Sequence, residues 1–365
     1  MNNQLYQYIK PLVAFGILVF MTWYFSDVVV CILVAIFLSM IGAPLAKYMN
    51  TWHIGKYTMP HGASAMLTMV LFLFLFGLFL LIIAPMILNQ AYLIKSIKID
   101  DIVVHFKDPM RNLDAFLVQY NIIKPGETFT RFIQLQVHDL VDMTRFRQHF
   151  TNIISATGTL VFGVFIILFL TYYFLLDDGL IKNFMLILSP DKYVDDISQV
   201  LHDSKFLLVR YFHGILTEVI IMISLETIGL LILGIPNAVL IGFIGGLMNV
   251  IPYLGPAIGM CLGIILGLLS ELGAKNYDML TYVVLGVMGV FAGAKVIDDL
   301  VLQPLIYSRS VKAHPVEVFL AIIIGGKLAG IIGMILAIPI YTILRVVLRQ
   351  FLNQMKLVKY LTSRM

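Results

Sequence analysis

The chain has 365 residues, of which 60% are hydrophobic and only 13% are charged. A soluble domain carries about 25% charged residues, so several segments of this chain are expected to face lipid rather than water. The formal net charge of +4 at pH 7 is small, whereas nucleic-acid binding requires a concentrated basic face. Composition therefore predicts an all-α polytopic membrane protein that lies in a lipid bilayer and has no nucleic-acid partner.

Apolar segments recur along the whole chain. A helix that crosses a bilayer needs about 20 predominantly apolar residues. Six segments are therefore expected to be transmembrane helices, although the first two are short. They fall at about 11–25, 28–46, 63–88, 153–176, 212–234 and 278–298. Two longer apolar runs, 236–271 and 315–349, remain, and the first is too long for one span and too short for two comfortable ones.

The stretches between these segments complete the expected organisation. Residues 89–150 mix both charge signs with apolar residues at helical spacing, and residues 189–211 do so too, which predicts amphipathic helices. Basic residues gather near the end of the chain and predict a cytoplasmic C-terminus. The expected parts are N-terminal transmembrane helices (1–88), an amphipathic extramembrane helical insertion (89–150), a transmembrane helix with an interfacial helix (151–211), a transport core (212–349) and a basic tail (350–365).

The first long run is interrupted at its midpoint by the stretch "NVIPYLGPAIG", Asn249–Gly259. Pro252 and Pro256 remove backbone donors, and Gly255 permits a turn. We therefore expect the tip of a re-entrant hairpin here. Broken backbone is tolerated at membrane depth only where protein or water covers it, so the break is expected to line a central hydrated pathway. Alternatively, the glycines only allow close helix packing.

The second long run resembles the first. Each follows a transmembrane segment and has an apolar lead-in, a glycine pair (Gly245–Gly246 and Gly325–Gly326) and a further breaker a few residues on. With the tail placed inside, the units 212–271 and 278–349 enter the membrane from opposite sides. This is the inverted-repeat plan of many secondary transporters.

Four stretches of sequence carry a resemblance to a known family: "YYFLLDDG" (172–179), "NVIPYLGPAIG" (249–259), "IDDLVLQPLIYSRSVKAHPVEVFLAIIIGG" (297–326) and "KLAGIIGMILAIPIYTILR" (327–345). They resemble the autoinducer-2 exporter family, also called the PerM-like permeases. The resemblance implies a multi-pass transport protein of a bacterial inner membrane, with cytoplasmic termini and a homo-oligomeric assembly. Family members are assigned autoinducer-2 export or sodium or lithium/proton antiport, so both activities stay open here.

Ionisable residues inside apolar segments are costly and are functional candidates. Glu218 and Glu226 lie about two turns apart on one expected helix, and either can exchange a proton for a cation or serve as a structural hydrogen-bonded acid. Lys295 and Asp299 are four residues apart and can form an ion pair; Asp298 adjoins them. The family resemblance points to Asp299, whereas Lys327 in the second broken run can meet an anionic group or extend to the membrane surface.

Polar and turn-forming residues complete the expected pathway. Asn249 and Tyr253 flank the first break, where they can recognise a hydroxylated solute or satisfy freed backbone groups. Gln303 and Pro304 supply the "QP" motif of the family that the sequence resembles. With Pro252, Gly255 and Pro256, these are the expected pathway residues.

Several chemistries have no motif in the sequence. There is no GxxxxGK[ST] phosphate loop, no HExxH or GxSxG motif and no cluster of Cys and His, so we predict no cofactor, no metal site and no enzymatic activity. The leading hypothesis is a secondary transporter that exports a small polar organic solute such as autoinducer-2. The alternative is a monovalent cation/proton antiporter, and an intramembrane enzyme is the least favoured.

Overall fold

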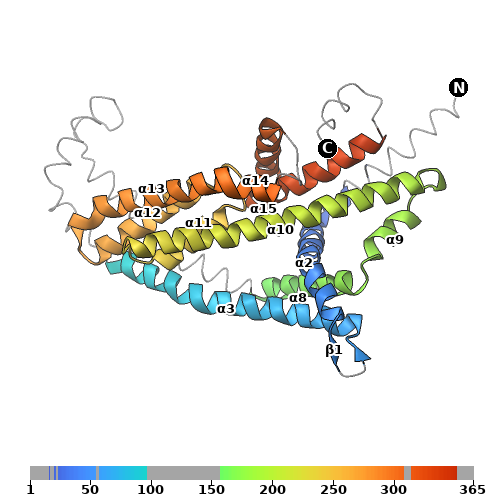
Figure 1. Ribbon diagram of the computed structural model, residues 1–365, viewed down its shortest axis with the longest axis horizontal. Helices are drawn as coiled ribbons and strands as arrows, with labels where there is room; N and C mark the ends of the chain where they lie inside the picture. The colour runs from blue at the N-terminus through green and yellow to red at the C-terminus, as the bar shows by residue number, and fades with distance from the viewer. Residues whose placement is uncertain are drawn as a thin grey trace. The chain divides into compact units, whose positions relative to one another are not determined.

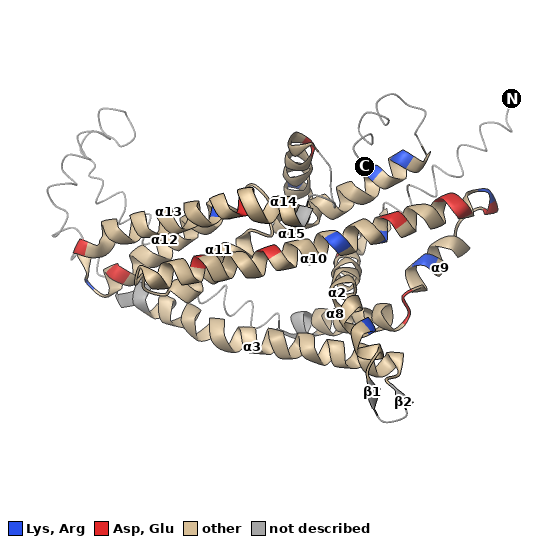
Figure 2. Cartoon of the chain, viewed as in Figure 1, with Lys and Arg blue, Asp and Glu red and all other residues tan. Residues whose placement is uncertain are grey.

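The computed structural model describes residues 24–54, 57–96, 157–307 and 314–351, together with Gly16, Phe20 and Met21. In this part of the chain, six helices are long and apolar enough to cross a membrane, and a bent helix pair adds a further candidate. The protein is therefore an all-α polytopic membrane protein, as its composition predicts. Figure 2 shows charged residues as isolated patches on otherwise uncharged helices. The basic tail from 352, most of the segment 11–25 and most of the insertion 89–150 lie outside the described residues.

The chain forms two compact units, Met1–Leu75 with Ser155–Leu201 and Phe76–Ile154 with His202–Met365. In the first unit, α2 packs against α8, and the fully buried Thr171 hydroxyl donates to the Ala35 carbonyl over 3.5 Å. Helices α8 and α9 meet at a bend of 87° (Figure 1). The elements of this unit are α2 (Ser26–Asn50), β1 (His53–Ile54), β2 (Tyr57–Thr58), the first part of α3 (His61–Ser96), α8 (Thr157–Leu176), α9 (Leu180–Ile187), η1 (Asp191–Tyr193) and the start of α10.

Helix α10 (Val194–Ile232) is one continuous helix of 39 residues. At 1.5 Å per residue it is about 58 Å long, roughly twice the hydrocarbon thickness of a bilayer. The sequence predicts an interfacial helix that ends at 211 and a separate transmembrane helix from 212, but the structure has no break between them. No proline interrupts 194–232, so the backbone continues and the amphipathic part becomes the first half of α10.

The first long apolar run folds as a helical hairpin, as the sequence predicts. Helix α11 (Ala238–Met248) ends before "NVIPYL", and α12 (Gly255–Gly273) begins after it. Tyr253 adopts a left-handed φ of 66° at the tip. The two arms approach so closely that a Cβ on Gly259 would lie 2.9 Å from the Cα of Gly245. Glycine is therefore required where the arms cross.

The second long run is also a hairpin, within α15 (Pro315–Phe351). Its helical geometry fails at Ala329 and Gly330, where Gly330 has φ 58° and ψ −139°. A Cβ on Gly325 would contact the carbonyl oxygen of Gly333, although eight residues of straight helix would separate the two by about 12 Å. The arms therefore run antiparallel about 329–330, which confirms the second predicted break.

The remaining elements of the second unit are η2 (Tyr277–Met279), α13 (Leu280–Ile297), η3 (Asp298–Leu302) and α14 (Gln303–Tyr307), in addition to the C-terminal part of α3. The segment η3 is a π-helix. A buried cluster joins α10, α11 and α13: Leu230, Ile235, Ala238, Ile241, Val283, Val287 and Phe291. Partly buried side chains of α12, such as Ile264, pack against it.

The two hairpins meet at the tip of the first. Ile251 packs with Ile322 and Ala337 of α15 in a second buried cluster. The ring of Tyr253 lies edge-on to Phe319, with the ring centroids 6.4 Å apart. The tip of the α11–α12 hairpin therefore rests on the arms of α15. The opposite membrane orientation of the two hairpins stays a prediction.

Candidate functional site

A polar pocket lies in the second unit, where the tip of the α11–α12 hairpin meets α10, the α13–α14 junction and α15. Its volume is about 320 Å³, within the range of small-molecule sites. Ten residues line it: Tyr211, Glu218, Asn249, Pro252, Tyr253, Lys295, Asp299, Gln303, Val318 and Ile338. Segments that are far apart in the sequence thus supply a single polar lining inside a membrane protein.

The structure brings together six of the predicted site residues in this pocket. They are Glu218, Asn249, Pro252, Tyr253, Asp299 and Gln303. The "IPYLGP" break and the "DDLVLQP" stretch, which the sequence analysis assigns to one expected pathway, thus share one pocket. Their role in a pathway stays a prediction. Glu226, Gly255, Pro256, Pro304 and Lys327 are not among the lining residues.

An ion-pair network lies along the pocket wall at the α13–α14 junction. The Lys295 ammonium lies 2.8 Å from Asp298 Oδ2 and 2.8 Å from Asp299 Oδ1, so the predicted Lys295–Asp299 pair is present. The Gln303 amide donates to the same two carboxylates, at 2.9 Å each. The Asp298 side chain is fully buried, whereas that of Asp299 is half exposed. Of the two carboxylates, that of Asp298 is therefore the one shielded from solvent.

The tip of the first hairpin supplies an amide and a phenol. Asn249 is 95% buried (5% exposed), and its Nδ2 has no hydrogen-bond partner among the described residues. A buried donor without a partner costs about 1–3 kcal/mol, so this amide is well placed to donate to an acceptor in the pocket. Tyr253 is 52% exposed and forms part of the pocket wall. Tyr253 has a left-handed backbone conformation and lies at the break in the helix.

The two predicted glutamates of α10 are both buried, but they lie in different surroundings. Glu218, 6% exposed, lines the pocket. Glu226, 2% exposed, faces Gly245 and leaves Oε2 without a hydrogen-bond partner among the described residues. Eight residues of helix place them about 12 Å apart along the axis. Only Glu218 can therefore meet a solute in the pocket directly.

The other predicted residues shape the backbone or lie at the surface. Gly255 packs against the Met248 carbonyl, where a Cβ would overlap it, and Pro256 lies in the first turn of α12, where a proline fits a helix. Pro304 is exposed at the start of α14. Lys327 is exposed near the tip of α15, and the described residues offer it no ion pair. Lys327 is not among the pocket-lining residues, and both roles expected for it stay predictions.

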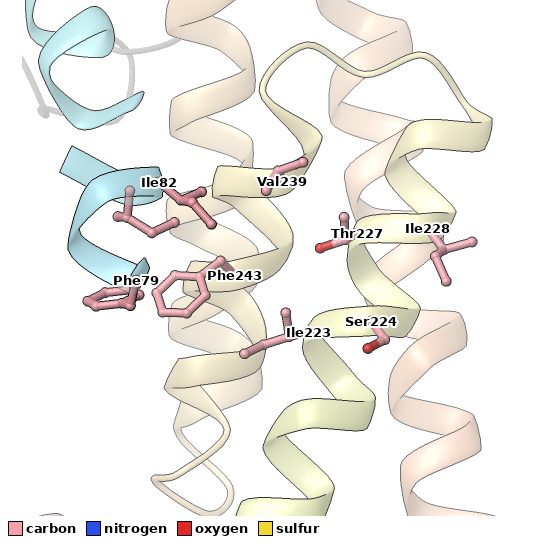
Figure 3. Close-up of a pocket in the computed structure, with 9 residues that line it drawn as sticks. Phe79, Ile82, Ile223, Ser224, Thr227, Ile228, Val239 and Phe243 are labelled. Carbon is pink, nitrogen blue, oxygen red and sulfur yellow. The ribbon is translucent and has the colours of Figure 1, made fainter. Parts of the chain in front are cut away.

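A second hollow of the same unit is apolar. Figure 3 shows Phe79 and Ile82 of α3 opposite Val239 and Phe243 of α11, with residues of α10 on the other side. Its volume is about 420 Å³, and only Ser224 and Thr227 bring oxygen atoms. The Ser224 hydroxyl donates to the carbonyl of Ile220 over 2.8 Å. This groove offers little to a polar solute, so the polar pocket is the better candidate site.

Sequence reasoning missed two features of the site. Tyr211 lines the pocket and is 3% exposed, but the sequence places it at the end of a supposed interfacial helix. The burial of Asp298 rather than Asp299 was missed as well, because a π-helix in η3 changes which side chains share a face. No sequence signal for a π-helix is evident here. Among the described residues, no group of three or more His, Cys, Asp and Glu could hold a metal ion.

Polytopic helices with broken hairpins around a polar pocket are an arrangement found in many membrane transporters. The model of the AI-2E family transporter matches residues 12–353. The chain therefore belongs to the AI-2E family of transporters.

Individual relatives match parts of the chain. YrrI of Bacillus subtilis (strain 168) is 34% identical over 185 residues, which cover 51% of this chain and 50% of YrrI. YueF of the same strain is 27% identical over 225 residues, which cover 60% of this chain and 58% of YueF. MJ1177 of Methanocaldococcus jannaschii is 27% identical over 227 residues, which cover 60% of this chain and 62% of MJ1177. The matches thus span about half to three fifths of the length of these relatives. Each relative carries the name "Putative transport protein", and none of these names gives a solute.

Proposed function

We propose that this chain is a secondary transporter that exports a small polar organic solute through the polar pocket, with autoinducer-2 as the first candidate. One observation carries the proposal: the predicted pathway residues from three distant segments line one pocket of about 320 Å³ within a membrane-spanning unit. The buried, unpartnered amide of Asn249 favours a solute with a hydroxyl or carbonyl acceptor. In this proposal the protein is a non-enzymatic permease.

The proposal is tested by loading proteoliposomes with autoinducer-2 and measuring its release. Asn249→Ala removes the buried donor, and Asn276→Ala is the matched control because Asn276 is exposed and outside the pocket lining. We expect release to fall at least tenfold for Asn249→Ala and to persist for Asn276→Ala. Release that is equal for wild type and both variants contradicts this pathway.

The sodium or lithium/proton antiporter is the second candidate. The observation that favours it is Glu226, which is 2% exposed and has an unpartnered Oε2 among the described residues. The test uses liposomes with a trapped pH-sensitive dye and an imposed sodium or lithium gradient. Glu226→Gln removes the exchangeable proton, and Glu271→Gln is the control because Glu271 is also a buried carboxyl, in α12, but is not among the side chains with an unpartnered buried atom in the described residues. Proton flux that is lost only in Glu226→Gln favours the antiporter.

The cellular setting belongs to the same proposal. The basic residues near the end of the chain support a cytoplasmic C-terminus, and the family resemblance supports a bacterial inner membrane and a homo-oligomer. In this view residues 212–349 are the transport core. Protease accessibility of a C-terminal tag in inside-out vesicles tests the orientation, and cross-linking in native membranes tests the assembly.

A further inference from the structure

The Lys295 ammonium lies between two carboxylates in the wall of the pocket. Its Nζ lies 2.8 Å from Asp298 Oδ2 and 2.8 Å from Asp299 Oδ1. The amide of Gln303 donates to these same two oxygen atoms. Two acceptor oxygens that are held in place by a third side chain form a site for a cation with N–H donors. Here a lysine of the same chain fills it.

The π-helix η3 positions the side chains that form this cation site. Asp298 and Gln303 are five residues apart, and in an α-helix such residues point about 140° apart around the axis. The i→i+5 geometry of a π-helix brings them to the same side. Gln303 therefore reaches Asp298 and, four residues away, Asp299 at the same time. π-bulges occur frequently at functional sites, and this one aligns the groups that bind the ammonium.

This cation site borders the pocket, and the lysine does not use all of its acceptor atoms. Lys295 and Asp299 both line the pocket, and one third of the lysine side chain is exposed. Asp298 is fully buried and keeps Oδ1 without a hydrogen-bond partner among the described residues. The Asn249 amide, 95% buried and also unpartnered within the described structure, lies in the same pocket. A ligand in this pocket thus meets Lys295, Asp299 and Gln303 directly, with Asp298 behind them.

We propose that Lys295 is a specificity-determining residue: a tethered ammonium that occupies a cation site made by Asp298, Asp299 and Gln303 and keeps external cations out of it. The site follows from the contacts alone, whereas its role in solute selection rests on the proposed transport through this pocket. A buried carboxylate that loses its cation is strongly disfavoured. Truncation of the lysine therefore leaves a site for a small primary alkylammonium ion.

The first experiment measures thermal unfolding of the purified full-length protein with added n-propylammonium, which replaces the lysine side chain beyond Cβ. We expect Lys295→Ala to unfold at a lower temperature than wild type. Propylammonium should restore its stability with a half-saturating concentration at least tenfold lower than any effect on wild type. Tetramethylammonium has the same charge but no N–H donor, so it should not restore stability. The double variant Lys295→Ala/Asp298→Asn should lose the propylammonium response.

Two outcomes overturn the site: an equal propylammonium response in wild type and Lys295→Ala, or a response that persists in the double variant. If Lys295→Ala does not fold, Lys295→Ser opens the same space, and failure of propylammonium to stabilise it also counts against the site. Uptake of radiolabelled propylammonium into liposomes tests the specificity role. We expect uptake at least tenfold faster for Lys295→Ala, and equal uptake by wild type overturns that role. The unfolding measurement tests the cation site without any exported solute. Failure of the export proposal would appear only in the autoinducer-2 release assay, so the two failures can be distinguished.

Discussion

The crossing of the two arms of the α11–α12 hairpin gives a quantitative prediction for Gly259→Ala. The new Cβ would lie 2.9 Å from Gly245 Cα and 3.1 Å from Gly245 O. Favourable carbon contacts lie at about 3.5–4.0 Å, so the arms must separate by roughly half to one ångström. Both neighbours are backbone atoms, and no side-chain rotation relieves the overlap. We expect a loss of about 1–3 kcal/mol in the free energy of unfolding, the usual cost of overpacking.

Gly289→Ala is the matched control. Gly289 lies within α13, and a Cβ there would meet nothing within 4 Å, so alanine should stabilise the helix by up to about 1 kcal/mol. The two variants should therefore differ by about 1–4 kcal/mol. Thermal and denaturant unfolding in one detergent measures this difference. Equal stability of the two variants would refute the close crossing of the arms.

Three further predictions concern the ion-pair network, the hairpin tip and the topology. Asp298→Asn should destabilise the protein by about 1–3 kcal/mol because it disturbs a buried charged hydrogen bond, whereas Asp299→Asn should cost about 0–1 kcal/mol; unfolding measurements that rank them equally contradict the burial. Tyr253→Gly should be about 1–2 kcal/mol more stable to denaturant than Tyr253→Ala, since only glycine adopts a left-handed φ without strain. Single cysteines at residues 252 and 332, in a background without the two native cysteines, should react with a water-soluble thiol reagent from opposite sides of the membrane. Reaction from one side would reject the inverted arrangement.

The breaks in the long apolar runs could be predicted because proline and glycine act locally. Pro252 and Gly255 disfavour a continuous helix whatever surrounds them, and the structure has its hairpin tip there. In α15 the break falls at Ala329–Gly330, a few residues after the glycine pair that drew attention to it. The pair Gly325–Gly326 instead lies where the arms contact one another.

Features that depend on tertiary context could not be predicted in this way. Helix α10 continues through 211 because a change from amphipathic to apolar composition does not itself end a helix. The burial of Asp298 rather than Asp299 depends on the extra residue that the π-helix η3 accommodates. Glu218 and Glu226 lie on the same helix, but only the packing of other elements decides that Glu218 reaches the pocket.

Irregular backbone inside a bilayer must be covered by protein or must line a cavity, because lipid cannot satisfy its polar groups. Two irregular places in the second unit meet this condition, since Tyr253 at the hairpin tip and Asp299 in η3 both line the polar pocket. The third place, Ala329–Gly330, is exposed and contributes nothing to the pocket. Within a single copy of the chain, this exposure fits a position that water or lipid headgroups reach. The exposed Lys327 beside it agrees with such a position, because a lysine at hydrocarbon depth is costly. The tip of α15 is thus expected at a membrane surface or an aqueous vestibule, whereas the tip of the α11–α12 hairpin packs against the α15 arms.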